Sequence, residues 1–171
     1  MRIRRNPSAA SRAAVRIRPC RPGEELALLA VFQSSVRGLA SRDYTPEQIE
    51  AWAPSATSDE FRRQWVARIR SNRPHVAELR GEPAAFADLQ ASGYIDQFFV
   101  AAEFAGRGVG AALMRHLLET ARSRNIACLS SHVSLTAQPF FRRFGFRLEK
   151  EQSPVLWGVA LRNGVMTRRL D

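Results

Sequence analysis

The feature that most constrains this chain is the stretch FFVAAEFAGRGVGAALMRHLLETA, which spans residues 98–121. An apolar segment typical of a strand leads into Gly106, Gly108 and Gly110, and a segment with apolar residues at helical spacing follows. Glycine permits tight turns, so successive N–H groups here can converge on one anion at the positive end of a helix. The stretch therefore predicts a strand, a glycine-rich turn and a helix that together form an anion site.

Two well-known phosphate-binding motifs resemble this stretch, and neither fits it. A Walker A loop requires a lysine and then a serine or threonine after its last glycine, and here Ala111 and Ala112 stand in their place. The dinucleotide fingerprint is matched formally by Gly106, Gly108 and Ala111. It also requires an acidic residue about 20 positions further on. Residues 126–132 contain none, which counts against a dinucleotide site.

A diphosphate held by backbone amides is the interpretation that we favour for the glycines. The N–H groups from Ala105 to Ala111 can converge on one anion, and Arg107 would add positive charge at the rim. The simpler alternative is a turn that joins a strand to a helix and binds nothing. The glycines by themselves leave both interpretations open.

The positive charge of the chain is concentrated at its N-terminus. The formal net charge is +10, and residues 1–23 hold seven arginines and no acidic residue. We expect residues 1–14 to form a basic leader without a fixed structure and residues 15–171 to form one domain. The leader has the composition of a transit peptide or of a basic arm, so nucleic-acid binding through its arginines is a function to test. The nearly balanced charge of the remainder does not favour nucleic acid as a partner.

Other features of the composition narrow the class of protein. With 171 residues, of which 45% are hydrophobic, the chain can bury the core of one domain. No stretch is apolar for long enough to span a membrane or to act as a secretory signal, which predicts a cytoplasmic protein. Cys20 and Cys128 lie far apart without metal-ligand spacing, so we expect neither a disulfide nor a metal site.

The order of apolar and polar patterns predicts an α+β fold. Alternation over residues 15–18 indicates a first strand, and a region of three helices follows, with Thr45 and Ser58 as expected N-caps. Three strands are expected next, the last of them continuous over residues 93–100. A helix over residues 108–124, a strand, a short helix and two or three closing strands complete the chain. The class is α+β with a mostly antiparallel mixed sheet and flanking helices.

Two motifs in this order resemble the GNAT superfamily of N-acetyltransferases. The coenzyme A motif of that family runs Gln/Arg-x-x-Gly-x-Gly/Ala after a strand that ends in valine, and here FFV is followed by AGRGVG at residues 105–110. The later signature of the family is an Asn or Ser, an Ala, an aromatic pair and Gly-Phe. It is matched at Ser134, Ala137, Phe140–Phe141 and Gly145–Phe146. The segments DYTPEQIEAWAP and GYID are similar to a bacterial GNAT subgroup.

The resemblance implies the GNAT element order β-α-α-β-β-β-α-β-α-β-β, in which the strand before the glycine loop splays from the next strand. It also implies acetyl-CoA as co-substrate, without a metal. The residues that it places on the cofactor are Phe98, Phe99, Val100, Ala105, Gly106, Arg107, Gly108, Val109, Gly110, Ala111, Ser134, Ala137, Phe140, Phe141 and Arg143.

This sequence departs from the family pattern at two positions. Ala105 replaces the usual Gln or Arg, which removes a side chain and keeps the backbone amide. Phe141 stands where many members carry a tyrosine that protonates the leaving thiolate, and a phenyl ring cannot donate a proton. The second departure leaves the source of that proton open.

Acetyl transfer to an amine requires a base or a desolvating pocket, because an alkylamine with a pKa of about 10.4 is protonated at neutral pH. Asp96 is the first candidate, since on a regular strand it shares one face with Phe98 and Val100. A cap of the preceding turn or an ion pair with an arginine is its structural alternative. His132 is the second candidate, with an exposed or structural role as its alternative. Ser134 can hydrogen-bond the pantetheine or donate to the thiolate.

Tyr44, Trp52 and Tyr94 are the candidate contacts of the acceptor substrate. The helical spacing of Trp52 from Ile49 is equally typical of a core residue. The function expected from these residues is acetyl-CoA-dependent acetylation of a primary amine of a small molecule or protein. The alternative is a non-catalytic acyl-CoA-binding domain, which the loss of the tyrosine at position 141 favours. Because the closing strands of the family often mediate dimers, a homodimer is one expected assembly.

Overall fold

The computed structural model describes residues 14–170, so the basic leader predicted for residues 1–14 lies outside the described residues except for Ala14. No helix among the described residues is long and apolar enough to cross a membrane. The elements in chain order are β1 (Arg16–Pro19), α1 (Glu25–Leu39), η1 (Ala40–Arg42), α2 (Pro46–Trp52), α3 (Asp59–Asn72), β2 (His75–Leu79), β3 (Glu82–Ala87), β4 (Tyr94–Ile95), β5 (Phe98–Val100), η2 (Ala102–Phe104), α4 (Val109–Ser123), β6 (Cys128–Ser134), α5 (Gln138–Arg143), β7 (Arg147–Gln152), β8 (Val155–Leu156), β9 (Val159–Ala160) and β10 (Asn163–Arg169).

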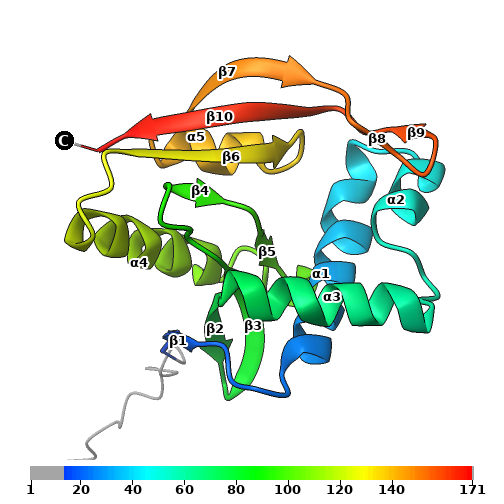
Figure 1. Ribbon diagram of the computed structural model, residues 1–171, viewed down its shortest axis with the longest axis horizontal. Coiled ribbons are helices and arrows are strands. Elements are labelled where there is room, and N and C mark those ends of the chain that lie inside the picture. Colours follow the sequence, from blue (N-terminus) through cyan, green and yellow to red (C-terminus); the bar gives the residue numbers. More distant parts are fainter. Residues whose placement is uncertain (1–13, 171) are drawn as a thin grey trace, which may run out of the picture.

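The strands form two four-stranded sheets and a small hairpin. One sheet has the order β1-β2-β3-β5 and the other the order β4-β6-β10-β7, while β8 and β9 pair only with each other. The β4–β6 pair is parallel, and the other pairs are antiparallel. Figure 1 shows the second sheet above the first, with β4 of the second sheet and β5 of the first at the edges that face each other. This arrangement confirms the α+β class with mostly antiparallel strands.

The prediction of one continuous strand over residues 93–100 is wrong. The chain belongs to the second sheet at β4 and to the first sheet at β5, with Asp96 and Gln97 between them. The buried carboxylate of Asp88 causes the break, because it accepts the backbone N–H of Gln97 at 2.7 Å and that of Asp96 at 3.3 Å. These two amides therefore bond a side chain instead of a neighbouring strand. The two sheets diverge from this point.

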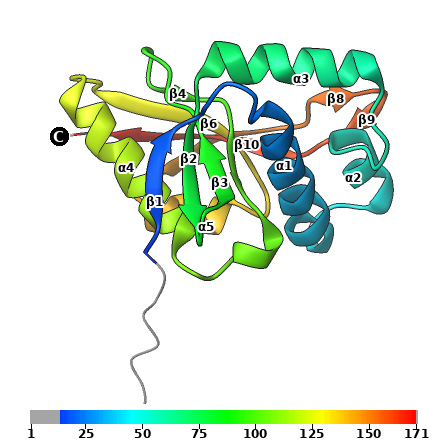
Figure 2. The same cartoon turned by 90° about the horizontal axis from the view of Figure 1, so that it is seen from below.

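The helical region between β1 and β2 contains three α-helices, as the residue pattern predicts, whereas the family order implied two. Thr45 caps α2 in a capping box with Gln48, and Ser58 caps α3, so both predicted N-caps are confirmed. Helix α1 packs on β3, β5 and α3, and α4 packs on β2 and β3. Viewed from below, α4 and α1 flank the first sheet on opposite sides (Figure 2).

Apolar residues at helical spacing anchor α1 and α4 to the sheets. On α1, Leu28, Phe32 and Val36 are buried at four-residue spacing. On α4, Leu113 and Leu117 are fully buried in the same way. Each such side chain contributes about 1.5–3 kcal/mol when it is removed from water. These anchors hold the glycine-rich start of α4 next to β5.

Candidate active site

A cavity of about 680 Å³ lies where the glycine-rich loop, β5, α4 and α5 meet. Most of the residues predicted to contact a cofactor line it: Phe98, Phe99, Val100, Ala105, Gly106, Gly108, Gly110, Ala111, Ser134, Ala137, Phe140, Phe141 and Arg143. Two predicted residues do not line it. The Arg107 guanidinium lies 5.8 Å from the ring centre of Phe104, and the Val109 side chain is buried in the core.

The glycine loop owes its shape to backbone angles that other residues rarely adopt. Gly106 and Gly108 have φ angles of +74° and +82°, and a Cβ atom at either position would meet nothing within 4 Å. Glycine is required there by the backbone conformation and not by lack of space. At Gly110 the reason is contact, since a Cβ there would lie 3.2 Å from the Val100 side chain. This close approach brings the start of α4 onto β5.

The loop exposes donors to the cavity at the start of α4. The first hydrogen bond of the helix runs from the N–H of Ala112 to the carbonyl oxygen of Gly108. The amides that precede Ala112 have no carbonyl partner within the helix, and they lie at its positive end. Backbone donors over residues 108–111 therefore suit a phosphate oxygen. The prediction that the N–H of Ala105 also faces this anion is wrong, because that N–H donates to the carbonyl oxygen of Ala102 at 3.2 Å.

The outer edge of β5 opens into the cavity. Strand β5 pairs with β3 on one side and is the last strand of its sheet. Because the N–H of Ala101 bonds the carbonyl oxygen of Ala84, alternation along an antiparallel pair turns the N–H groups of Phe98 and Val100 away from β3. Strand β6, which would otherwise pair with them, pairs with β4 and β10. The gap between β5 and β6 is the predicted splay.

Sequence reasoning missed several residues of this cavity. Arg42 and Arg115 line it together with the predicted Arg143, so three cations surround it. Arg115 lies four positions after Ala111 on α4, so helical spacing from the glycine loop was a signal for it. Arg42 follows α1 in a 3-10 turn, and no local pattern links it to the loop.

Phe141 is a packing residue. Its side chain is 2% exposed, and its ring contacts those of Phe98, Phe140 and Phe146 with centre distances of 5.0–5.9 Å. Phe98, Phe140 and Phe141 of this cluster line the cavity. A proton for a leaving group at this place must come from another residue or from water.

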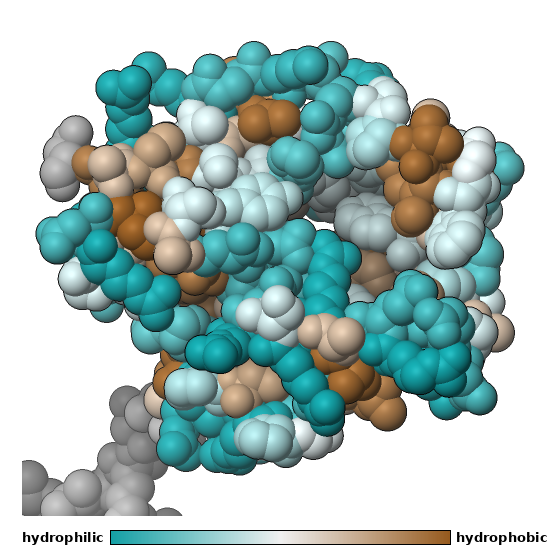
Figure 3. Space-filling view, in the orientation of Figure 1, coloured by the Kyte–Doolittle hydropathy of each residue, from teal (hydrophilic) through white to brown (hydrophobic). Residues whose placement is uncertain are grey.

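A second cavity of about 410 Å³ lies on the other side of β5. Trp52, Phe99 and Ser134 line both cavities, so the two meet at these residues. Figure 3 shows the surface hollowed beside an apolar patch over the β8–β9 hairpin. The sequence predicted Trp52 as an acceptor contact, and its place between the two cavities is compatible with that role.

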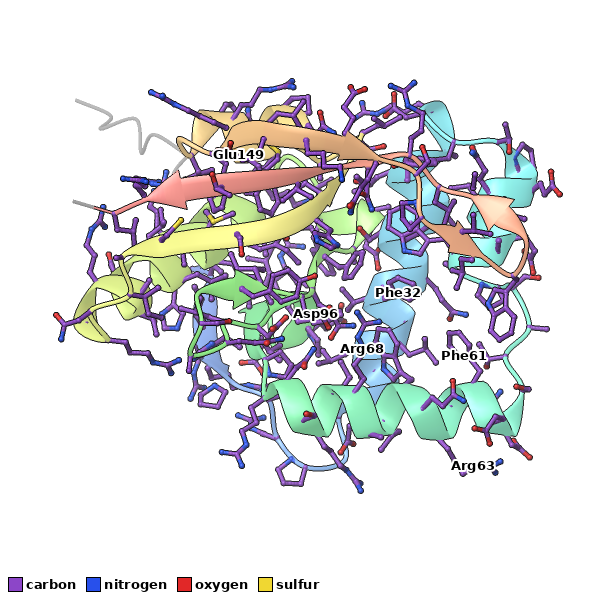
Figure 4. All side chains as sticks on the ribbon, turned by 45° about the horizontal axis from the view of Figure 1, so that its top comes forward. Phe32, Phe61, Arg63, Arg68, Asp96 and Glu149 are labelled. Carbon is purple, nitrogen blue, oxygen red and sulfur yellow. The ribbon has the colours of Figure 1, made fainter. Side chains whose placement is uncertain are left out.

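Asp96 lines the second cavity, whereas Phe98 and Val100 line the first. The expectation that the three share one face is wrong, because the break between β4 and β5 interrupts the alternation of the strand. Figure 4 shows Arg68 of α3 directed toward Asp96, while Arg63 of the same helix points away. Arg68 bonds both carboxylate oxygens of Asp96 at 2.7 and 2.8 Å. The ion pair with an arginine, which the sequence left open as the structural alternative for Asp96, is therefore present.

The electrostatics of Asp96 do not suit a strong base. Burial raises the pKa of its carboxyl group, but the hydrogen bonds and charge of Arg68 outweigh burial and hold the pKa below its usual value. Asn72 donates a further hydrogen bond at 2.7 Å. A carboxylate of low pKa is poorly matched to an ammonium group, so Asp96 is better suited to hold positive charge than to accept the proton of an amine.

The other predicted polar residues differ in which cavity they line. His132 is exposed and lines the second cavity, and Ser134 lines both. The Ser134 oxygen accepts the N–H of Ala137 at 3.2 Å, which leaves its own proton free to be donated. The Tyr44 ring lines the second cavity, but its hydroxyl donates to the carbonyl oxygen of Arg162 at 2.5 Å. Tyr94 lines neither cavity and packs against His132.

Comparison with known proteins identifies the family. The model of the acetyltransferase (GNAT) domain matches residues 40–156. This chain belongs to the GNAT acetyltransferase family. YafP of Escherichia coli K12, described as an uncharacterized N-acetyltransferase, is 36% identical over 138 residues, which cover 81% of this chain and 85% of YafP.

Solved structures agree with this assignment. A GCN5-related N-acetyltransferase from Rhodopseudomonas palustris has a TM-score of 0.84 and 30% identity, over 96% of this chain and all of that chain. YncA from Salmonella typhimurium, whose structure holds its cofactor acetyl-CoA, has a TM-score of 0.65 and 17% identity, over 93% of this chain and 95% of that chain. At that identity the likeness to YncA shows the fold alone. The GNAT fold expected from the sequence is confirmed.

Asp88, which sequence reasoning missed, maintains the break that opens this GNAT site. Its side chain is fully buried. Burial raises the pKa of Asp88 to about 6, although the N–H bonds from Gln97 and Asp96 act in the opposite direction. A pKa above the usual value of 3.8 means that the fold prefers the protonated form. The stability from this preference is complete below pH 3.8 and is lost as the pH rises through about 6.

We expect Asp88→Asn to remove this pH dependence, because the amide cannot ionise. Relative to the variant, the wild-type protein should lose about 2–3 kcal/mol of unfolding free energy between pH 4 and pH 8. Chemical denaturation across this range measures the difference. The exposed carboxylate of Asp59, changed to Asn, is the matched control. Wild-type and Asp88→Asn curves that run parallel over the whole range would contradict the role given to Asp88.

Proposed function

We propose that this protein transfers the acetyl group of acetyl-CoA to a primary amine by direct attack of the amine on the thioester. The observation that carries the proposal is the open edge of β5, which lies between two cavities that meet at Trp52, Phe99 and Ser134. A thioester in the first cavity and an amine in the second would meet at that edge. The structure of YncA, which has the same fold, holds acetyl-CoA, and this supports acetyl-CoA as the cofactor.

In this proposal the backbone binds the cofactor and polarises its carbonyl group. The amides at the start of α4 hold the diphosphate, and the apolar residues around Phe140 contact the pantetheine arm. The N–H of Val100, turned toward the gap, donates to the thioester oxygen and stabilises the oxyanion that develops. The amine nitrogen bonds the carbonyl carbon, the bond from that carbon to sulfur breaks, and the thiolate leaves.

Three proton transfers accompany the reaction: the ammonium group loses one proton before the attack, the nitrogen loses a second to water after it bonds the carbonyl carbon, and the thiolate gains one. We assign removal of the ammonium proton to His132, directly or through water, because its imidazole lines the acceptor cavity and Asp96 is committed to Arg68. The negative charge of Asp96 then stabilises the imidazolium. We assign protonation of the thiolate to the hydroxyl group of Ser134, which regains a proton from solvent. Two of the three predicted catalytic residues, His132 and Ser134, take these roles. The third, Asp96, stabilises the imidazolium through its charge.

A non-catalytic acyl-CoA-binding domain is the second candidate, and the buried phenyl ring of Phe141 favours it. Release of free thiol from acetyl-CoA, measured with the full-length protein and a panel of primary amines, separates the two. We expect amine-dependent thiol release. If calorimetry shows acetyl-CoA binding and no amine in a broad panel releases thiol, the binding domain is correct. If calorimetry shows no binding of acetyl-CoA to folded protein, both candidates fail.

Arg143 is expected to contact the 3′-phosphate of the cofactor. It lines the cofactor cavity, and its guanidinium lies 5.7 Å from the centre of the Phe140 ring. We expect Arg143→Ala to raise KM for acetyl-CoA about tenfold, because one charge-assisted phosphate contact is lost. The control is Arg142→Ala, since Arg142 instead bonds the side chain of Gln138 at 3.2 Å. With 3′-dephospho-acetyl-CoA, Arg143→Ala should no longer raise KM. An equal rise in KM with both cofactors would contradict the contact between Arg143 and the 3′-phosphate.

A further inference from the structure

The acceptor cavity is lined mainly by aromatic rings. Within the described residues its aromatic lining is Phe32, Tyr44, Trp52, Phe61, Trp65, Phe99 and Trp157. These rings come from α1, α2 and α3, from the loop before α2, from β5 and from the tip of the β8–β9 hairpin. Figure 4 shows Phe32 and Phe61 on opposite sides of this space, on α1 and α3. Such a lining favours a ligand with a flat apolar group.

The inner rings of the cavity form a fixed floor. Phe32 packs edge-on against Phe99 and at a tilt against Trp65, with ring centres 4.9 and 5.0 Å apart. Trp52 packs edge-on against both Tyr44 and Phe99. The indole N–H of Trp65 donates to the carbonyl oxygen of Glu25 at 2.7 Å. Because this polar atom is already bonded, the floor offers apolar ring surface to a ligand.

The charges of the cavity do not favour an acceptor with several positive groups. In the described part of the chain, Asp96 is the single carboxylate that lines it, and Arg68 and Asn72 already bond both of its oxygens. Arg68 and Arg162 also line the cavity and are positive. A polyamine or a lysine-rich peptide would bring additional cations beside these arginines without a free carboxylate to receive them.

Trp157 occupies a position that folding does not explain. Together with Gly158 it forms the two-residue turn between β8 and β9, and both residues have positive φ angles, +51° and +78°. Turns of this kind favour asparagine or glycine at the first position, and a bulky residue there is strained. The Trp157 side chain is also 78% exposed, although it lines the acceptor cavity. Strain and exposure together suggest a role in binding.

The geometry points to a primary amine that carries an aromatic ring and no second cation as the acceptor, with Trp157 covering the ring. This inference rests on the proposed function of the second cavity as the acceptor site. The ring would lie between the aromatic floor and Trp157, and its amine would point to the junction at Ser134. A cavity of about 410 Å³ is near the small end of small-molecule sites, which suits one or two rings.

Steady-state thiol release with the full-length protein tests the inference. The amines are 2-phenylethylamine, n-propylamine and spermidine. We expect kcat/KM for 2-phenylethylamine to exceed that of the other two by at least about tenfold, because only it can use the aromatic lining. If n-propylamine or spermidine reacts as well as 2-phenylethylamine, acetyl transfer stands and the aromatic acceptor is overturned.

Substitution of Trp157 tests whether its side chain covers the aromatic ring of the acceptor. Trp157→Ala should raise KM for 2-phenylethylamine about tenfold with little change in kcat or in KM for acetyl-CoA, and Trp157→Phe should restore most of the loss. The matched control is Val155→Ala, which shortens the other large exposed apolar side chain of this hairpin, one that lines neither cavity. Equal loss for all three amines in Trp157→Ala would overturn the assignment.

Equilibrium binding separates failure of this inference from failure of the proposed function. Calorimetry of 2-phenylethylamine with the protein saturated with coenzyme A requires no turnover. Binding that Trp157→Ala weakens about tenfold, without thiol release from any amine, would reject acetyl transfer and support the aromatic site. Absence of both binding and reaction with 2-phenylethylamine would reject the aromatic site.

Discussion

Gly108→Val is expected to weaken acetyl-CoA binding by roughly 100-fold, which corresponds to about 3 kcal/mol. Gly108 has a φ angle of +82° at the start of α4, and a β-branched residue is strongly disfavoured there. Relaxation to a negative φ would turn the following amides away from the cavity. Each lost bond from an amide to a charged phosphate costs about 1.5–3 kcal/mol, so one or two such losses account for the effect. Calorimetry with acetyl-CoA measures it.

The control for this variant is Gly81→Val in the turn between β2 and β3. Gly81 also has a φ angle of +82°, and a Cβ atom there would likewise meet nothing within 4 Å. The two variants therefore introduce the same backbone strain, one inside and one outside the cavity proposed for the cofactor. Thermal unfolding should show a similar loss of stability for both. If the two variants bind acetyl-CoA equally well, the backbone of the glycine loop does not hold the cofactor.

Ser134→Ala is expected to lower kcat by about 100- to 1,000-fold, the range for loss of a proton donor in the transition state. Ser134 lies where the two cavities meet, and its hydroxyl proton is free because its oxygen accepts the N–H of Ala137. The neighbouring aromatic position, Phe141, has no proton to give. KM for acetyl-CoA should change little. Thiol release under saturating cofactor and amine gives the measurement.

The matched control is Ser130→Ala on the same strand. Ser130 lies four residues before Ser134, on the same face of β6, and lines neither cavity. It should retain wild-type kcat. An unchanged kcat in Ser134→Ala would show that the thiolate leaves without help from this hydroxyl, with water as the remaining donor. A rise in KM without a fall in kcat would instead make Ser134 a contact of the pantetheine.

Sequence reasoning succeeded where a local pattern determines the structure. The caps at Thr45 and Ser58 and the strand, turn and helix around Gly108 lie within a few residues of the groups that they organise. It failed at Asp96. The prediction assumed that side chains alternate between the two faces as in a regular strand, but Asp88 causes a break in that strand. Asp88 lies eight residues before Asp96, and no strand pattern marks its side chain as a partner of the backbone.

By itself the sequence determined the glycine loop and most of the order of elements, because glycine content, capping residues and apolar periodicity act over short distances along the chain. It indicated the family through the resemblance of two motifs. Only the tertiary structure decided which cavity each side chain faces. Arg68 meets Asp96 across 28 positions, and the Tyr44 hydroxyl meets the carbonyl oxygen of Arg162 across 118. Such contacts depend on how the helices and the two sheets pack together, and for that reason local patterns do not encode the second cavity.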